Sequence, residues 1–366
     1  MGNPAINLNS RNRRVGIGAL AATFFLCYFS WSNIFHSYHY PSVPHPTTSS
    51  PGFLPIEDAL KFCENRRWEI WRHRSRRRKV YDLILVNTEI DWLEIRLGQM
   101  YDQVDYFVIL EANLTFQDTP KPLFVQESWD RYEKYHSKMI RHTLNIKGVK
   151  FENTWDREKF SRNAMYDQVV PYLKGRQAPN MGDVILVSDV DEIPRPSTLT
   201  ALRNCKFPKK LSLHSDMYYY GFQWRKRGDW AFPQATYYDG NNTVRPDDLR
   251  GTADSHLYRA AWHCSYCFST IGEFVKKLNS FSHAELNRDT FKDTQQILQH
   301  VRDGIDLYNR EGEQYDRIEN NSDVPEFLKE NKEKYLYMFD RDPENANFVD
   351  LQYLEESTDI ETTTGS

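Results

Sequence analysis

The chain has 366 residues, 40% of them hydrophobic, which is enough for the core of one catalytic domain of roughly 250–280 residues with appendages. Its 47 basic and 51 acidic residues leave a formal net charge of −4, which argues against a protein that binds nucleic acid through its overall field. Aromatic residues make up 14% of the chain, a share that suits either an aromatic core or stacking on flat ligands such as sugars and bases.

The N-terminus predicts a membrane anchor. Residues 15–35 carry no charge and are long enough to cross a bilayer as a helix, and Arg11, Arg13 and Arg14 stand just before them. A cleaved signal peptide is the alternative, but the stretch is longer than a usual signal core and no convincing cleavage site follows. We therefore expect a single-pass type II protein with a cytoplasmic tail (residues 1–14), a signal anchor and a lumenal body.

Two segments flank the expected catalytic domain, which we place at residues 80–339. Residues 36–79 form a stem that begins with a Pro-, Ser- and Thr-rich stretch, a composition that favours extended chain. The stem ends in a basic block, residues 72–79, which in a soluble protein could be a nuclear signal or an anion patch. Behind an anchor, a solvated surface or a protease-sensitive boundary fits better. Residues 340–366 are acidic and then Thr-rich, and we expect them to be disordered.

Between these segments, apolar runs alternate with helical periodicity, a pattern typical of α/β domains. The pattern predicts strands at residues 81–86, 106–110, 140–146 and 183–187, and helices over residues 92–100 and 155–173. Because the last strand is continuously apolar, it fits a central parallel strand that is covered on both faces. We therefore expect an α/β fold with a mainly parallel central sheet.

The stretch ILVSDVDEIP ends an apolar strand in three acids. Since ligand groups in parallel sheets gather beyond the carboxyl ends of strands, Asp189 and Asp191 stand where chemistry is expected. In an extended chain both would project from the same side, with Val190 pointing into the fold and Pro194 and Pro196 ending the strand. Two carboxylates with open positions suit Mn²⁺ or Mg²⁺ shared with a substrate diphosphate, as in a nucleotide-sugar transferase.

Asp-x-Asp alone is a weak pattern, and a solvated turn is its ordinary alternative. Haloacid-dehalogenase phosphatases carry it on their first strand, followed by Thr or Val, whereas here it comes late and Glu192 follows. An EF-hand loop needs Gly at its sixth position, which Ile193-Pro194 does not supply. Together with the anchor and stem, the motif predicts a Golgi-type glycosyltransferase with a GT-A-like nucleotide-sugar-binding fold.

Several stretches between about residues 81 and 339 resemble glycosyltransferase family 17. They are DLILVNTE and DWLEIRL within residues 82–97, DYFVILEA at 105–112, SDVDEIP at 188–194 and WHCSYCF at 262–268. The resemblance implies UDP-N-acetylglucosamine as donor, a divalent metal, inversion at the anomeric carbon, and transfer in β-1,4 linkage to the β-linked core mannose of N-glycans or glycoproteins. It covers the donor side better than the acceptor side, because family members need not share an acceptor.

An inverting transfer needs a general base that takes the proton from the acceptor hydroxyl. Our candidate is Glu285, which follows a helical stretch after the Cys-containing segment, and Asp254 and Glu111 are its rivals. Each of the three has a simpler alternative as a surface or structural acid.

Other polar residues are candidates for binding the donor or the metal. His263 and His283 could contact the metal or phosphate, although a lone His is more often packed in a core. Arg162 could contact the diphosphate or simply pair with Glu158 one helical turn away. At the carboxyl ends of strands we expect a donor-binding group made of Glu89, Asp91, Glu111, Asp189 and Glu192, with Asp189, Asp191 and His263 as metal ligands.

The cysteines fit an oxidising compartment. Cys27 lies in the anchor, which leaves Cys63, Cys205, Cys264 and Cys267 with three possible pairings. Because Cys264 and Cys267 stand three apart in what reads as a strand, we expect them to bond to distant partners and not to each other, and we expect neither zinc nor redox chemistry.

Two other interpretations stay open. The chain could be a membrane-tethered glycan-binding protein that keeps the fold without the chemistry, although its Asp-x-Asp is intact. It could also be a metal-dependent transferase of this fold with a different donor or acceptor. Asn113, Asn241 and Asn320 begin glycosylation sequons, which are usable only if they are lumenal and exposed.

Overall fold

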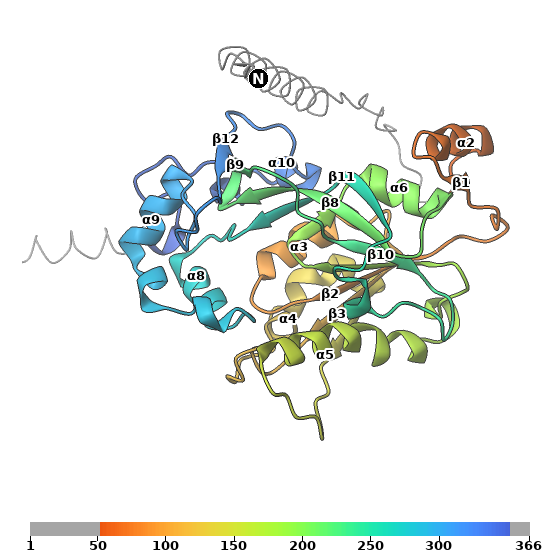
Figure 1. Ribbon diagram of the computed structural model, residues 1–366, viewed down its shortest axis with the longest axis horizontal. Helices are drawn as coiled ribbons and strands as arrows, with labels where there is room; N and C mark the ends of the chain where they lie inside the picture. Colours follow the sequence, from red (N-terminus) through yellow and green to blue (C-terminus); the bar gives the residue numbers. More distant parts are fainter. Residues whose placement is uncertain (1–51, 352–366) are drawn as a thin grey trace, which may run out of the picture. The chain divides into compact units, whose positions relative to one another are not determined.

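The computed structural model describes residues 52–351 of the protein, which contain one large mixed sheet with helices packed on both faces (Figure 1). Eight strands of this sheet follow the order β12-β9-β8-β10-β5-β2-β3-β4, and β11 pairs with β8 and β6. The strands are β2 (Val80–Leu85), β3 (Tyr106–Glu111), β4 (Met139–Thr143), β5 (Val184–Asp189), β6 (Glu192–Pro194), β8 (Leu211–Tyr219), β9 (Gly221–Lys226), β10 (Gln234–Tyr237), β11 (Ser255–Ser265) and β12 (Tyr315–Arg317). A separate two-stranded sheet joins β1 (Glu69–Ile70) to β7 (Cys205–Lys206).

The helices are mostly short. The α-helices are α2 (Ile56–Glu64), α3 (Ile90–Met100), α4 (Phe124–Glu127), α5 (Thr154–Asp167), α6 (Pro196–Asn204), α7 (Pro246–Leu249), α8 (Ile271–Leu278), α9 (Thr294–Asp303) and α10 (Glu326–Glu330). The 3₁₀ helices are η1 (Trp129–Lys138), η2 (Val170–Tyr172), η3 (Gly175–Gln177), η4 (Ala284–Leu286), η5 (Asp289–Lys292) and η6 (Leu336–Met338).

The sheet is parallel on one side and mixed on the other. β4, β3, β2 and β5 pair in parallel, as the sequence predicts, and the expected helices appear as α3 and α5. Beyond β5, β10, β8, β9 and β12 pair antiparallel, whereas β11 pairs with β8 in parallel, so the expectation of a mainly parallel sheet is wrong for most of this half. The reason is local: β8 and β9 are joined through Tyr220 alone, and so short a connection can link only antiparallel neighbours.

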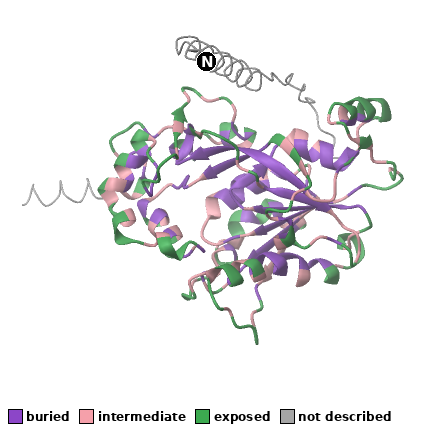
Figure 2. Cartoon of the chain, in the orientation of Figure 1, coloured by how far each residue is buried: buried purple, intermediate pink, exposed green. Residues whose placement is uncertain are grey.

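The parallel half is buried on both faces because successive side chains of a strand point to opposite sides. On β2, Val80 and Ile84 belong to the apolar cluster that contains the side chains of α3, whereas Tyr81 and Leu83 belong to the cluster that contains those of α5. Figure 2 shows these strands as continuous buried segments between the two helical layers. This covering explains why their sequences are apolar throughout.

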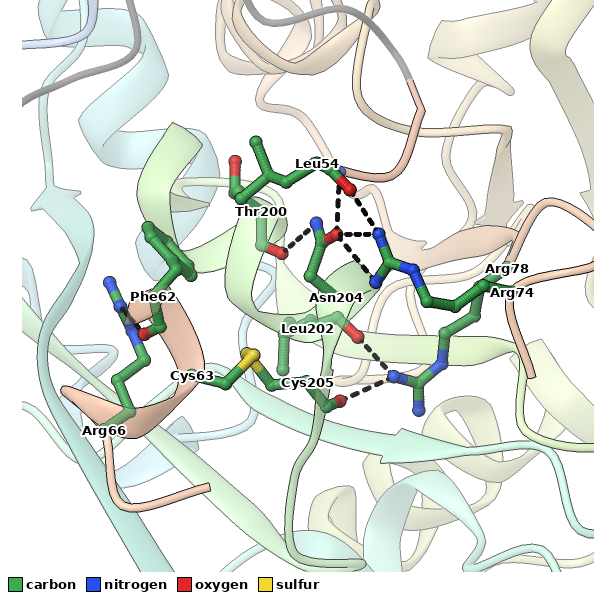
Figure 3. The surroundings of a disulfide bond; sticks show 10 residues. All are labelled: Leu54, Phe62, Cys63, Arg66, Arg74, Arg78, Thr200, Leu202, Asn204 and Cys205. Carbon is green, nitrogen blue, oxygen red and sulfur yellow. Dashed lines mark hydrogen bonds between the residues drawn. A yellow bond between two sulfur atoms is a disulfide. The ribbon is translucent and has the colours of Figure 1, made fainter. Parts of the chain in front are cut away.

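Most of the basic block is exposed, as expected for a solvated surface, but its end at Arg78 is packed against the domain. Arg78 is 2% exposed and donates to the carbonyl of Gly182 at 2.6 Å. It also donates to the carbonyls of Leu202 and Cys205, both at 2.7 Å (Figure 3). Next to it, Cys63 of α2 forms a disulfide with Cys205. The packed unit therefore includes part of the expected stem.

The second disulfide joins Cys264 to Cys267, so the expectation that these cysteines bond to distant partners is wrong. β11 ends at Ser265, and Tyr266 has a φ of 55°. Because the chain turns at Tyr266, the Cα atoms of the two cysteines come to 5.8 Å, within the range of a disulfide.

The expected tail is also packed where the structure describes it. Arg341 and Phe348 are both fully buried, and Asp350 accepts hydrogen bonds from the first two backbone N–H groups of α8, at Ile271 and Gly272. Residues 352–366 lie outside the described part of the chain, as do the predicted cytoplasmic tail and anchor. Within residues 52–351, no helix is long and apolar enough to cross a membrane.

Candidate active site

The Asp-x-Asp motif lies at the carboxyl end of β5, as predicted, but its chain is not extended. β5 ends at Asp189, Val190 and Asp191 form a turn, and β6 begins at Glu192. The chain is therefore not extended through the motif, but the side chains lie as expected: both aspartates reach the same cleft and Val190 is buried in the core. β6 pairs antiparallel with β11, which places His263 opposite Glu192.

A buried arginine holds this turn in place. Arg96 of α3 makes two hydrogen bonds of 2.7 Å to the carboxylate of Asp82, and neither side chain is exposed. Its Nη1 donates to the carbonyls of Glu192 at 2.6 Å and Asp189 at 3.2 Å. The Arg96 side chain therefore holds the carbonyls on both sides of the turn from the core side. The aspartate carboxylates are thus directed toward the cleft.

Glu192 supports the turn from inside. It is fully buried, and its carboxylate accepts hydrogen bonds from the backbone N–H of Asp189 at 3.0 Å and from Trp230 Nε1 at 2.7 Å. Burial and the nearby charge of Asp189 raise the pKa of this carboxyl. Glu192 does not line the cleft, and it lies behind the residues that do.

Asp189 is held by two arginines. Arg162 Nη2 lies 2.8 Å from Oδ1 of Asp189 and also 2.8 Å from Glu158, so Arg162 makes the helical pair and a contact to the motif at once. Arg250 Nη1 approaches Oδ2 of Asp189 at 3.7 Å. Burial opposes the charge of Asp189, but the two guanidinium groups outweigh it and lower its pKa.

Asp191 is held by a lysine and a histidine. Its Oδ2 lies 3.5 Å from Lys277 Nζ and 3.7 Å from His263 Nε2, and the side chains of all three residues are largely buried. Lys277 also lies 3.7 Å from Glu89. Burial destabilises the charged form of both groups, but the attraction between their opposite charges is the larger effect. The pKa of Asp191 is therefore lowered and that of Lys277 is raised.

These groups line one cleft with a volume of about 400 Å³. Of the predicted site residues it brings together Glu89, Arg162, Asp189, Asp191 and His263, and it also includes His283. The cleft is further lined by Arg250, Lys277, Lys226, Arg310, Glu158, Glu313, Tyr219, Tyr266, Tyr308, Trp155 and Trp230 among others. Its walls are thus aromatic and its floor carries closely paired charges.

The other predicted residues lie elsewhere. Asp91 binds Arg131 and Tyr337, and Glu111 is buried against Arg141. Neither lines the cleft.

Both remaining candidates for the general base also lie outside the cleft lining. Asp254 is exposed just before β11; its neighbour Ser255 lies opposite Leu211 of β8 and His263 opposite Met217, so the two ends are roughly 20 Å apart along the sheet. Glu285 is exposed at the rim, where its Oε1 lies 2.7 Å from His283 Nδ1.

Four buried polar atoms of the cleft residues have no hydrogen-bond partner within the described chain. They are Nη1 of Arg162, Nη1 of Arg250, Nδ1 of His263 and the hydroxyl oxygen of Tyr219. Buried donors without partners are costly, and two guanidinium groups with spare donors suit an anion such as a diphosphate. The cleft is therefore arranged to receive a negatively charged ligand beside Asp189.

The two aspartates fit a divalent ion only if the ligand helps to hold it. No group of three or more His, Cys, Asp or Glu side chains within residues 52–351 is arranged to bind a metal by itself. Mg²⁺ and similar ions, however, commonly use one or two carboxylates and take their remaining ligands from substrate phosphates and water. Asp189 and Asp191 match such a shared site, with His263 beside them.

Sequence reasoning missed the two cations that complete the floor. Lys277 lies on α8 and Arg250 follows α7, both far along the chain from the motif. Nothing in the local pattern distinguishes Lys277 from its neighbour Lys276, which is exposed. Only the packing of α8 beside the turn singles out Lys277.

Comparison with known proteins adds a family. A family model described as glycosyltransferase family 17 matches residues 42–342. The human beta-1,4-mannosyl-glycoprotein 4-beta-N-acetylglucosaminyltransferase is 25% identical over 308 residues, which cover 76% of this chain and 54% of the human protein. The rat protein of the same name is 24% identical over 273 residues, covering 66% of this chain and 48% of the rat protein.

The chain thus spans about half the length of these curated relatives. Among solved structures, a mannosyltransferase from Pyrobaculum calidifontis in complex with GDP-Man and Mn²⁺ aligns with 77% of this chain and 78% of its own. The sequence identity is 10% and the TM-score 0.31, which is too low to support an argument about the site.

Proposed function

The chain belongs to glycosyltransferase family 17, and we propose that it is an inverting transferase that moves N-acetylglucosamine from UDP-N-acetylglucosamine to the β-linked core mannose of N-glycans in β-1,4 linkage. The observation that carries the proposal is the cleft in which Asp189 and Asp191 stand among Arg162, Arg250 and Lys277. Such a cleft suits a sugar linked to a diphosphate. The name of the curated relatives supplies the sugar, the acceptor and the linkage.

The residues of the cleft have separate tasks in this proposal. Asp189 and Asp191, with His263 beside them, would hold Mn²⁺ or Mg²⁺, which neutralises the diphosphate leaving group when it is bound. Arg162 and Arg250 have unpartnered Nη1 donors, which would bind the same phosphates. Because these groups are fixed before the donor arrives, little reorganisation is needed as charge develops on the departing UDP.

Aromatic side chains around the floor suit the sugars. Trp230 packs beside His263 with ring centroids 5.0 Å apart, and Trp155 at the rim is 48% exposed. Flat rings of this kind pack well against the apolar faces of pyranose rings.

We also propose a type II topology with the catalytic domain in the Golgi lumen. The uncharged residues 15–35 and the arginines before them support an anchor of this orientation. Two disulfides within the described residues are compatible with the oxidising lumen.

The proposal is tested by incubating the purified full-length chain with UDP-N-acetylglucosamine, Mn²⁺ and a panel of N-glycans that contain the core mannose. We expect release of UDP and a product heavier by one N-acetylhexosamine, with its linkage fixed by mass spectrometry after glycosidase digestion. Chelation of the metal with EDTA should stop the reaction, and addition of Mn²⁺ should restore it.

The matched control replaces both motif acids, Asp189→Asn and Asp191→Asn, and should show no turnover. UDP release with another sugar nucleotide or another acceptor would keep the transferase but change its substrates. No UDP release from any donor, together with no metal-dependent binding of UDP, would refute transferase activity and favour a glycan-binding protein.

A further inference from the structure

The proposed inverting transfer requires a base for the acceptor proton, and the carboxylates that line the cleft are poor candidates. Each is paired with a cation: Glu89 with Lys277 at 3.7 Å, Glu158 with Arg162 at 2.8 Å, Asp189 with Arg162 at 2.8 Å, Asp191 with Lys277 at 3.5 Å, and Glu313 with Lys226. A cation beside a carboxylate stabilises its charged form and so weakens it as a base.

Two histidines also line the cleft, and they differ in their surroundings. His263 is buried, faces Asp191 and packs against Trp230, so it belongs to the floor. The side chain of His283 is 49% exposed at the rim, with its Nδ1 2.7 Å from Oε1 of Glu285. Nε2 of His283 makes no hydrogen bond to any residue of the described chain.

The carboxylate of Glu285 determines which nitrogen of His283 is free. Because a carboxylate accepts hydrogen bonds, it favours the tautomer with the proton on Nδ1, and this leaves the lone pair on Nε2. A histidine held in this way is the usual form of a general base, with the carboxylate stabilising the imidazolium that forms.

His283 is also connected to the floor of the cleft. The carbonyl of its neighbour Ser282 accepts a hydrogen bond of 2.7 Å from Thr154 of α5, and the Ser282 hydroxyl donates to Glu158. Glu158 in turn binds Arg162, which binds Asp189. The segment that carries His283 is thus fixed to the helix that also positions the proposed diphosphate-binding arginine.

Trp155, which is exposed and lies on α5, packs edge to face against the ring of His283, with ring centroids 4.7 Å apart. A sugar that packs on this indole would place its hydroxyl groups beside the imidazole. The two rings line the same cleft as the charged floor, at positions where both side chains are about half exposed and could meet an acceptor.

We propose that His283 is the general base of the transfer and that Glu285 is the positioning residue that holds it, an inference that rests on the proposed function. The acceptor oxygen forms its bond to the anomeric carbon as the bond from that carbon to the β-phosphate oxygen breaks. The hydroxyl proton passes to Nε2 of His283, and UDP leaves with the bonding electron pair. The imidazolium then returns its proton to water.

This assignment revises the interpretation of Glu285 as the base itself. The hydrogen bond from His283 lowers the pKa of Glu285, and its side chain is 58% exposed and does not line the cleft. The other charged groups around the segment are already engaged: Glu158 with Arg162, and Arg288, whose Nε donates to the Glu285 carbonyl.

The test measures kcat and KM of the full-length chain and of its His283→Ala variant as a function of pH. The pH range runs from about one unit below to two units above the ordinary histidine pKa of about 6.5. We expect kcat to fall roughly 10²- to 10⁴-fold while KM for UDP-N-acetylglucosamine and the UDP affinity stay within about twofold. The decline of the wild-type rate at acid pH should disappear, and added imidazole should restore part of the rate because the site is open to solvent. His283→Asn serves as a second variant if the alanine variant does not fold.

The matched control is His73→Ala, because His73 is also exposed and also meets a tryptophan edge, Trp71 at 5.2 Å, but lies outside the cleft. It should keep the wild-type rate and pH profile. A His283 variant with near-normal kcat, or one whose loss is neither rescued by imidazole nor accompanied by a changed pH profile, would overturn the proposal. Absence of turnover in the wild type would instead reject the proposed function.

Glu285→Gln tests the positioning role separately. Without the carboxylate the imidazolium formed in the reaction is less stabilised, so the acid side of the pH–rate profile should shift to lower pH and the plateau rate should fall. A purely structural role would change the rate without moving the profile. An unmoved profile would therefore refute the role of Glu285.

Discussion

At the scale of single residues, Lys277 forms ion pairs with two acids in the floor of the cleft. Its side chain is 15% exposed and pairs with Asp191 and Glu89. Removing one partner of a buried ion pair leaves an uncompensated charge, which typically costs about 3–5 kcal/mol. We therefore expect Lys277→Met to lower the free energy of unfolding by about that amount in urea denaturation.

The control is Lys276→Met, which changes an exposed lysine on the same helix and should have little effect. In the double variant Asp191→Asn with Lys277→Met, part of the lost stability should return, because one of the unpaired charges is gone. Equal losses at positions 276 and 277 would contradict the pairing.

Asp306 gives a pH-dependent prediction for the loop that carries Tyr308. The carboxylate is 3% exposed and accepts hydrogen bonds from the backbone of Tyr308 and from the backbone and side chain of Arg310. Burial alone would raise its pKa, but these donors outweigh burial and lower the pKa below the ordinary 3.8. Its stabilising contribution is therefore complete above pH 3.8 and is lost as the pH falls through the folded-state pKa.

We expect Asp306→Asn to lower the free energy of unfolding by about 1–3 kcal/mol at neutral pH, where the wild-type carboxylate is charged. In acid, the difference between variant and wild type should shrink as the wild-type group takes up its proton. Urea denaturation at several pH values measures this, with the exposed Asp303→Asn on α9 as control. A difference that grows in acid would contradict the sign.

At the scale of elements, the predictable part of the fold is the part whose sequence is uniformly apolar. β2, β3 and β5 are covered on both faces, and their continuous apolar sequences indicate this burial. β8 is just as buried, but its sequence LSLHSDMYY contains polar residues such as Asp216, which pairs with Arg195 inside the protein. Because distant partners satisfy these groups, the local sequence pattern does not reveal β8 as a buried strand of the sheet.

The same distinction applies to the site. The place of Asp189 and Asp191 follows from the rule that α/β sheets present ligand groups at the carboxyl ends of their strands. The cations around them come from other elements, as with Lys277 on α8, and no periodicity marks them. Sequence thus indicates where the acids lie, whereas tertiary packing decides what neutralises them.

The two disulfides differ in the length of chain they close, which predicts different effects. Cys63 and Cys205 are 142 residues apart, whereas Cys264 and Cys267 are three apart. Since closing a longer loop removes more entropy from the unfolded chain, replacing the first pair by serine should cost about 2–5 kcal/mol and replacing the second pair less. Urea denaturation of the two double variants measures the order.

The effects of the two disulfides on transfer activity should be in the opposite order to their effects on stability. The turn closed by Cys264 and Cys267 contains Tyr266, which lines the cleft, whereas Cys63 and Cys205 join α2 to β7 away from it. We therefore expect the second pair of serines to slow transfer more than the first. A variant of the first pair that loses more activity at full folding would contradict this assignment.

At the scale of the whole molecule, both ends of the described chain complete the catalytic domain. Arg78 near one end and Arg341 near the other are each almost fully buried and each donate to three backbone carbonyls. Carbonyls left buried without a donor cost about 1–3 kcal/mol each. The packed unit therefore extends beyond residues 80–339, the boundaries that the sequence suggests.

Truncation tests this directly. A chain of residues 52–351 should unfold at the same urea concentration as a longer one, whereas residues 80–351 lose Arg78 and the Cys63–Cys205 disulfide, and residues 52–339 lose Arg341. We expect each of the shorter chains to be less stable by at least about 3 kcal/mol, because each strands buried carbonyls that an arginine satisfied. Residues 80–339 should combine both losses and fail to fold cooperatively. An unchanged unfolding midpoint for residues 80–339 would show that the arginines at the two ends do not contribute to the stability of the domain.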